Sequence, residues 1–121
     1  MNAVMPFSER AYGSPALRGA RDTEYDIFSR VTRMLRQAPA ECKTVATIAA
    51  VSKNNELWTL LASDLGHPDN ALPDEVKAGL LSLAAFSIRH GAAVLAGTAT
   101  TEPLIDINLC VMRGLRGEGA Q

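Results

Sequence analysis

A chain of 121 residues, 47% apolar and 21% charged, has the composition of one folded domain, which excludes an intrinsically disordered chain. Its 12 basic and 13 acidic side chains give a formal charge of −1, which excludes a generally basic surface for nucleic acid. Cys42 and Cys110 have neither zinc-site nor disulfide-framework spacing, so we expect two buried free thiols.

The N-terminus has no basic start followed by an apolar core, as a secretory signal requires. No window reaches the eighteen or so apolar residues of a membrane span. We therefore expect a cytoplasmic protein without membrane insertion. Within residues 1–21, Pro6, Gly13, Pro15 and Gly19 predict a mobile or partly helical, partly ordered N-terminal arm.

The first clear helical pattern is predicted to begin near Asp22 or Thr23 and to end at about Ala38, before a proline. Thr23 and Asp26 have the spacing of a capping box with Asp in place of Glu. One wide side of the helix is apolar, as in a helix that packs into a core. The opposite side carries three arginines, which indicate either a solvated face or a phosphate-binding one: Arg30, Arg33 and Arg36.

A second helical segment is predicted from Pro39 or Ala40 to Leu65, since proline is tolerated in a first turn. The pair Asn54-Asn55 is a weak point, because asparagine is a poor interior helix residue. One long bent helix and two shorter helices both fit this pattern.

The only tryptophan, Trp58, lies in this second segment. An indole buries a large apolar area while its N–H requires an acceptor, which suits both a core and a partner-binding groove. The two alternatives stay open from the sequence.

After the second segment, Gly66 is predicted to form a left-handed helix cap, and Pro73 to occupy the first turn of a third helix over residues 74–97. Two sides of the third helix are apolar, which predicts a largely buried central helix. The first side comprises Val76, Leu80, Leu83, Ser87, Gly91 and Val94, and the second Leu81, Ala85, Ile88, Ala92 and Leu95.

Thr101 is predicted to cap a last helix over residues 102–115, which also has two apolar sides, more than a single core contact needs. Residues 116–121 are predicted to form a disordered tail. No segment has a strand pattern and no repeat is present. The fold class is therefore all-α, a single-domain bundle of four to five helices over residues 22–115.

Residues suited to catalysis are few. His67 lies in a turn and His90 in the third helix, and no second residue completes a catalytic pair with either. The acidic residues around the turn lack calcium-loop spacing, and glycine-rich phosphate loops are absent. We therefore predict no catalytic, cofactor-binding or metal-binding residues and a helical binding module that is not an enzyme.

Three segments together carry a family resemblance: LWTLLASDL, DNALPDEVKAGLLSLAAF and PLIDINLCVMRGL. With them the sequence resembles the FlaF family of flagellar biosynthesis regulators from about Ala11 to Leu115. Asn54-Asn55 departs from the family, where basic residues often precede the Leu-Trp pair. The matching positions are Trp58, Asp64, Leu65, Asn70, Leu72, Pro73, Leu104, Ile105, Asp106, Ile107, Asn108 and Met112.

The resemblance implies a cytoplasmic protein needed for flagellin synthesis or export, with flagellin and FlbT as partners. The hypothesis is a secretion chaperone that covers an amphipathic terminal helix of unassembled flagellin. The side chains expected to contact that helix are Trp58, Leu61, Leu65, Leu72, Ile105, Leu109 and Met112.

Two alternatives remain beside the chaperone. The first is a regulator of flagellin mRNA translation, alone or with FlbT, although the net acidity argues against direct nucleic-acid binding. Its basic contacts would be Arg30, Arg33, Arg36 and Lys43. The second is a structural homodimer that covers its apolar faces with a second copy.

Overall fold

The computed structural model describes the backbone of residues 15–39 and 43–115 and the side chains from residue 24 onward within them. Every element in this part of the chain is a helix, so the predicted all-α bundle is confirmed. The four helices are α1 (Pro15–Gln37), α2 (Val45–Leu65), α3 (Asp74–Leu95) and α4 (Glu102–Leu115).

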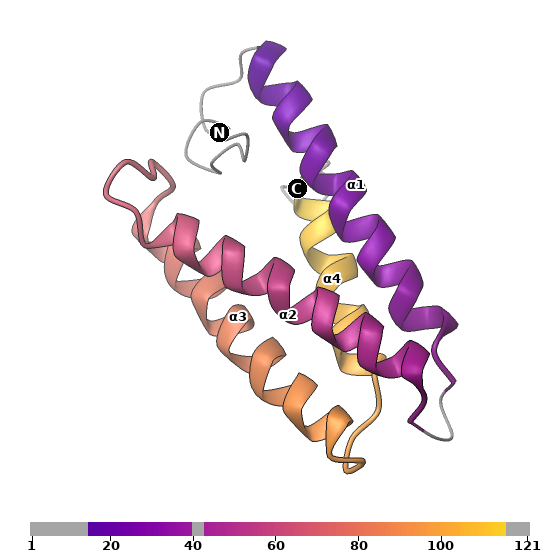
Figure 1. The fold of residues 1–121 in the computed structure, drawn as a ribbon. Coiled ribbons are helices and arrows are strands. Elements are labelled where there is room, and N and C mark those ends of the chain that lie inside the picture. Colours follow the sequence, from indigo (N-terminus) through magenta and orange to yellow (C-terminus); the bar gives the residue numbers. More distant parts are fainter. Residues whose placement is uncertain (1–14, 40–42, 116–121) are drawn as a thin grey trace.

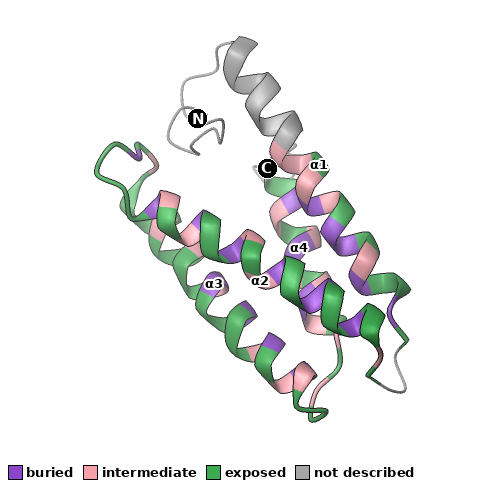
Figure 2. Cartoon of the chain, viewed as in Figure 1, coloured by how far each residue is buried: buried purple, intermediate pink, exposed green. Residues whose placement is uncertain are grey.

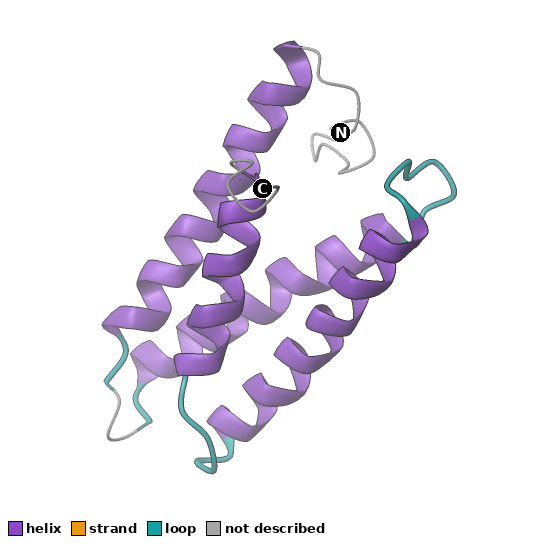
Figure 3. Ribbon diagram, turned by 180° about the vertical axis from the view of Figure 1, so that it is seen from behind, coloured by secondary structure: helices purple, strands orange, loops and turns teal. Residues whose placement is uncertain are grey.

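The four helices form two antiparallel pairs that cross (Figures 1 and 3). The pair α1 and α4 packs along its length, and so does the pair α2 and α3. Helix α1 also crosses α2, whereas α3 meets α4 over a much smaller contact. Helix α2 therefore packs on both α1 and α3, whereas its backbone makes no close contact with α4.

Helix α1 begins at Pro15, so the start predicted near Asp22 or Thr23 is wrong. Proline is favoured in a first turn because its missing N–H would have no intrahelical acceptor there. The predicted capping box at Thr23 therefore lies inside the helix. Most of the arm predicted over residues 1–21 lies outside the described residues, as does the tail predicted over 116–121.

Helix α2 begins at Val45, later than predicted, because two threonines cap it reciprocally. Thr44 Oγ1 accepts a hydrogen bond from the Thr47 backbone N–H at 3.3 Å, and Thr47 Oγ1 accepts one from the Thr44 N–H at 3.1 Å. Two N–H groups with no intrahelical acceptor are thereby satisfied. The helix continues unbroken through Asn54 and Asn55, so the single-helix alternative is the observed one.

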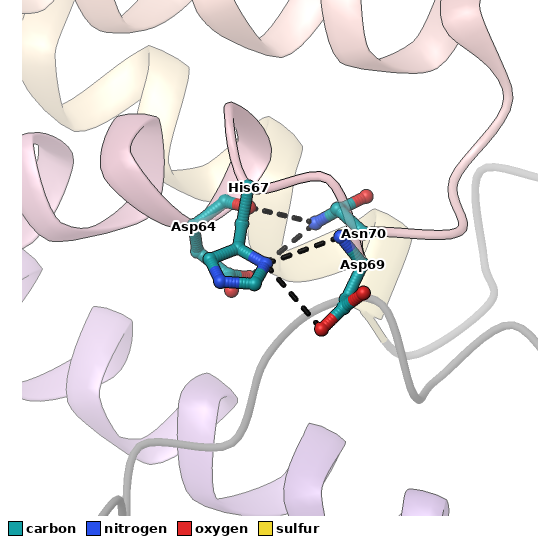
Figure 4. Close-up of polar contacts among 4 residues, drawn as sticks. All are labelled: Asp64, His67, Asp69 and Asn70. Carbon is teal, nitrogen blue, oxygen red and sulfur yellow. Dashed lines mark hydrogen bonds and ion pairs between the residues drawn. The ribbon is translucent and has the colours of Figure 1, made fainter.

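The turn between α2 and α3 is held by Asn70 (Figure 4). Its side-chain nitrogen donates to the Asp64 carbonyl oxygen at 3.2 Å. Its side-chain oxygen accepts from the Leu72 N–H at 3.1 Å. Gly66 has φ −83°, so the predicted left-handed cap is wrong. Pro73 precedes the first helical residue, one position earlier than predicted.

The core consists of two clusters along the crossing of the helix pairs (Figure 2). In one cluster Trp58 packs edge-on against Phe28, with ring centroids 5.7 Å apart. The other cluster is built around Leu35, Val51 and Leu104, each completely buried. Most buried members of the two clusters come from α1 and α2, and α3 and α4 each add one to each cluster, so α1 and α2 form the centre of the bundle.

Helix α3 was predicted to be the buried central helix, and this prediction is wrong. Only Ala84, Ser87, Gly91 and Val94 are buried on it, and Ala84 and Val94 belong to the two core clusters. The remaining perimeter is half-buried or exposed (Figure 2). Since its contact with α4 is small, α3 has one broad protein partner, which is α2.

The expectation that no window is apolar enough for a membrane span is wrong for α3. By length and composition, α3 is the one helix in the described part of the chain that is apolar enough to cross a bilayer, and 22% of its apolar window is buried. Buried helices of other proteins have the same composition, so this property is weak support for a span.

The buried face of α3 depends on Gly91, which lets α2 approach closely. A Cβ at this position would lie 3.1 Å from Val51 Cγ1 and 2.8 Å from Asn55 Oδ1, whereas one at Gly79 would meet nothing within 4 Å. We expect Gly91→Val to lower the free energy of unfolding by about 1–3 kcal/mol, because the two helices must separate.

Urea denaturation of Gly91→Val and of the matched control Gly79→Val checks this expectation. The Gly79 variant is expected to stay within about 0.5 kcal/mol of the parent, since its side chain enters open space. Equal effects at the two positions would show that close packing at Gly91 does not hold α3 on α2.

Candidate functional site

The described residues contain no group of three or more histidine, cysteine or carboxylate side chains able to hold a metal ion. His67 lies in the turn, where its Nδ1 accepts a hydrogen bond from the Asp69 N–H at 3.1 Å (Figure 4). His90 lies on α3, with Nε2 2.8 Å from the Thr100 carbonyl oxygen. Each imidazole thus has a local structural contact.

Cysteine placement differs from the prediction of buried thiols. Cys110 is exposed on α4, and its Sγ accepts a hydrogen bond from Arg113 Nη2 at 3.3 Å. The helical spacing places it on the side of α4 that faces away from the core. Cys42 lies outside the described residues.

Six of the seven residues predicted to contact a partner gather around one core cluster, and four of these are buried in it. Ile105 packs instead at the edge of the other cluster. In this conformation the buried four present almost no surface to a partner, and their predicted binding role stays a prediction. The buried four are Trp58, Leu61, Leu65 and Met112, and the two packed against them are Leu72 and Leu109.

Trp58 is 0% exposed, so the alternative that places it in the core is the observed one. Its indole Nε1–H donates to Asn108 Oδ1 on α4 at 3.0 Å. Asn108 Nδ2 in turn donates to Asn54 Oδ1 on α2 at 2.9 Å. We call these three side chains the polar chain.

The polar chain gives a physical role to two parts of the resemblance, the Leu-Trp pair and the PLIDIN segment. All three of its residues are 0% exposed, so no water replaces these hydrogen bonds from the surface. A buried polar group that is left without a partner costs about 1–3 kcal/mol. Only one register of α4 against α2 gives the indole N–H its acceptor on Asn108, so the polar chain selects that register.

The longest continuous line of exposed apolar side chains among the described residues lies on α3. Four side chains at spacing i, i+4, i+7 and i+11 follow one line along the helix, and all of them are exposed. Leu81 is 39% exposed and Ile88 37%, with alanines between and beyond them. We call this line the α3 stripe; it consists of Leu81, Ala85, Ile88 and Ala92.

Other large exposed apolar side chains are dispersed. Val45 and Ile48 lie at the start of α2, and Leu60 lies four turns further along it. On α3 itself, Phe86 stacks on His90 with ring centroids 5.3 Å apart. None of these continues into a line as long as the α3 stripe.

Periodicity identified the residues of the α3 stripe as one apolar side of a helix but assigned that side to the core. The spacing of apolar residues is the same whether a helix faces its own core or an external partner. The contacts of α3 decide between the two, because its other side is the one that packs on α2.

A family model described as flagellar protein FlaF matches residues 9–115 of the chain. All four described helices fall within this segment. No curated protein and no solved structure matches the chain.

The polar chain leads to a stability prediction. Asn108→Ala removes the acceptor of the Trp58 N–H and the donor to Asn54, so two buried polar groups lose their partner. We expect the free energy of unfolding to fall by about 2–4 kcal/mol.

The matched control is Asp106→Ala, an exposed position on the same helix, which is expected to change stability by less than about 0.5 kcal/mol. Thermal and urea denaturation of both variants provide the measurement. An Asn108 variant as stable as its control would contradict the structural role of the polar chain.

Proposed function

The chain belongs to the FlaF family of flagellar proteins, and from this premise we propose that it is a secretion chaperone that binds unassembled flagellin and so supports flagellin synthesis or export. The observation that carries the proposal, beside the family, is the α3 stripe. An apolar line on the outer side of a packed helix is the surface that an amphipathic helix recognises. Flagellin polymerises through such helices at its termini.

The chemistry of the α3 stripe suits a helical ligand. Its residues recur every three to four positions over three turns, and a partner helix presents its own apolar residues with the same period. Ala85 and Ala92 are short, so a partner backbone can approach α3 closely between Leu81 and Ile88. No charge lies on the line itself.

A chaperone must also release its cargo. A standard protein interface buries about 800 Å² per partner, and affinity depends on the quality of its central contacts more than on area. One helix face with two large side chains offers fewer such contacts than a standard interface. A moderate affinity, suited to delivery at an export gate, is the expected consequence.

The proposal places the protein in the cytoplasm, where flagellin is made before export. Covering an amphipathic terminal helix there would prevent flagellin from assembling or aggregating early. FlbT is a proposed second partner, because the family is linked to it as well as to flagellin. The seven side chains first expected at the interface are mostly core residues, so the binding surface is assigned to the α3 stripe.

A second candidate function is regulation of flagellin mRNA, supported by the placement of basic residues. Arg30, Arg33 and Arg36 are all exposed along α1. Lys43 instead donates from Nζ to the Leu95 carbonyl oxygen at 2.5 Å. RNA affinity that falls steeply with salt and disappears on reversing Arg33 and Arg36 to glutamate would favour this function.

Calorimetry tests the chaperone proposal. Purified protein is titrated with monomeric flagellin and with flagellin lacking either terminal segment, and we expect binding that is lost with one segment. Ile88→Glu is expected to weaken binding by about tenfold or more, because it places a charge in the centre of the apolar contact.

Leu60→Glu is the matched control, since Leu60 is 56% exposed on α2 and lies outside the α3 stripe. It is expected to keep the parent affinity, and circular dichroism verifies the fold of both variants. Absence of binding to intact flagellin would refute the chaperone function. Equal loss in the two variants would refute only the assignment to α3.

A further inference from the structure

We propose that, without flagellin, the α3 stripe of one molecule packs against the α3 stripe of a second copy, with the two helices antiparallel and related by a two-fold axis. The proposal comes from the order of side-chain sizes along the line. Large and small residues alternate at Leu81, Ala85, Ile88 and Ala92. This order is complementary to its own reverse.

The register follows from that alternation. With the two-fold axis passing between positions 86 and 87, Leu81 faces Ala92 of the second copy and Ala85 faces its Ile88. Every large side chain then meets a small one, which is the arrangement that fills space between packed helices. A parallel pairing in register would set Leu81 against Leu81 and alanine against alanine, and the helix separation that the large pairs require would leave gaps at the alanine pairs.

The surroundings of α3 are compatible with this pairing. The helix lies at the edge of the bundle, and the described residues of its own chain leave the α3 stripe uncovered. Antiparallel helices place the positive end of one helix dipole beside the negative end of the other. Arg89 flanks the line and would lie on the same side in both copies, so added salt should strengthen the dimer by screening this pair.

The size of the contact predicts a weak dimer. The α3 stripe spans the twelve residues from Leu81 to Ala92, about 16 Å of helix. A single helix face of this length buries less than the ~800 Å² per partner of a standard interface. The dimer should therefore dissociate on dilution, and a competing helix can replace the second copy.

This exchange has a consequence that rests on the proposed function. If flagellin binds the same line, dimer and flagellin complex exclude each other. The second copy then covers the apolar surface until flagellin is made. The dimer itself does not depend on flagellin, so the two proposals can fail separately.

Disulfide cross-linking tests the register. In a Cys42→Ser, Cys110→Ser background, Ala85→Cys should form a disulfide with the same introduced cysteine of the second copy, because the two copies of residue 85 are offset by only three residues, about 5 Å along the helix axis. Ala92→Cys is the matched control on the same line. Its two copies lie about 16 Å apart along the axis, so it should not cross-link alone.

A mixture of chains gives the decisive comparison. Leu81→Cys and Ala92→Cys should each remain uncross-linked alone and should form a mixed disulfide when combined, since these two positions face each other. Self-cross-linking of Ala92→Cys as efficient as that of Ala85→Cys would overturn the antiparallel register. Absence of every cross-link would overturn the dimer.

Sedimentation velocity without flagellin measures the dimer independently. The parent and Leu60→Glu should show a concentration-dependent monomer–dimer equilibrium, and Ile88→Glu should stay monomeric while retaining its helical circular dichroism. A parent that stays monomeric at its highest soluble concentration would overturn the proposal. So would binding of the parent, but not Ile88→Glu, to phosphatidylglycerol vesicles without any dimer, which would assign the line to a membrane surface.

Discussion

Two hydrogen bonds of Asn108, one from the Trp58 indole N–H and one to Asn54 Oδ1, constrain how α4 lies against α2. They join the centre of α2 to the centre of α4 through three completely buried side chains. Apolar packing is tolerant of small shifts, whereas an unpaired buried amide or indole is costly. The polar chain therefore fixes how the α2–α3 pair lies across the α1–α4 pair.

That arrangement determines which surface is left for a partner. Helix α2 packs on α1 and α3 and reaches α4 through the side chains of Trp58 and Asn54, whereas α3 meets α4 over a small contact only. The α3 stripe is then left without a helix of the bundle to pack against. Its apolar line at Leu81 and Ile88 consequently faces solvent. The core and the proposed binding surface are thus two results of the same helix order.

Sequence reasoning predicted the elements best where local signals are strong. The acidic first turn at Asp74 and Glu75 marked the third helix, and the bounds of the fourth were predicted as observed. Sequence reasoning failed where the burial of a residue depends on contacts with a distant part of the chain. The spacing of apolar residues shows that one side of a helix is apolar, but not what covers that side. The contacts between the helices show that α3 lies at the edge of the bundle, and its complete burial shows that Trp58 is a core residue.

A nuclear magnetic resonance titration of the isotope-labelled protein with unlabelled monomeric flagellin would test the central claim that the core tryptophan organises the bundle while the α3 stripe binds the partner. The account predicts that methyl signals of Leu81, Ala85 and Ile88 shift or broaden while the Trp58 indole N–H signal keeps its position and its protection from exchange. A shifted, exchanging Trp58 signal beside unchanged α3 methyl signals would contradict it.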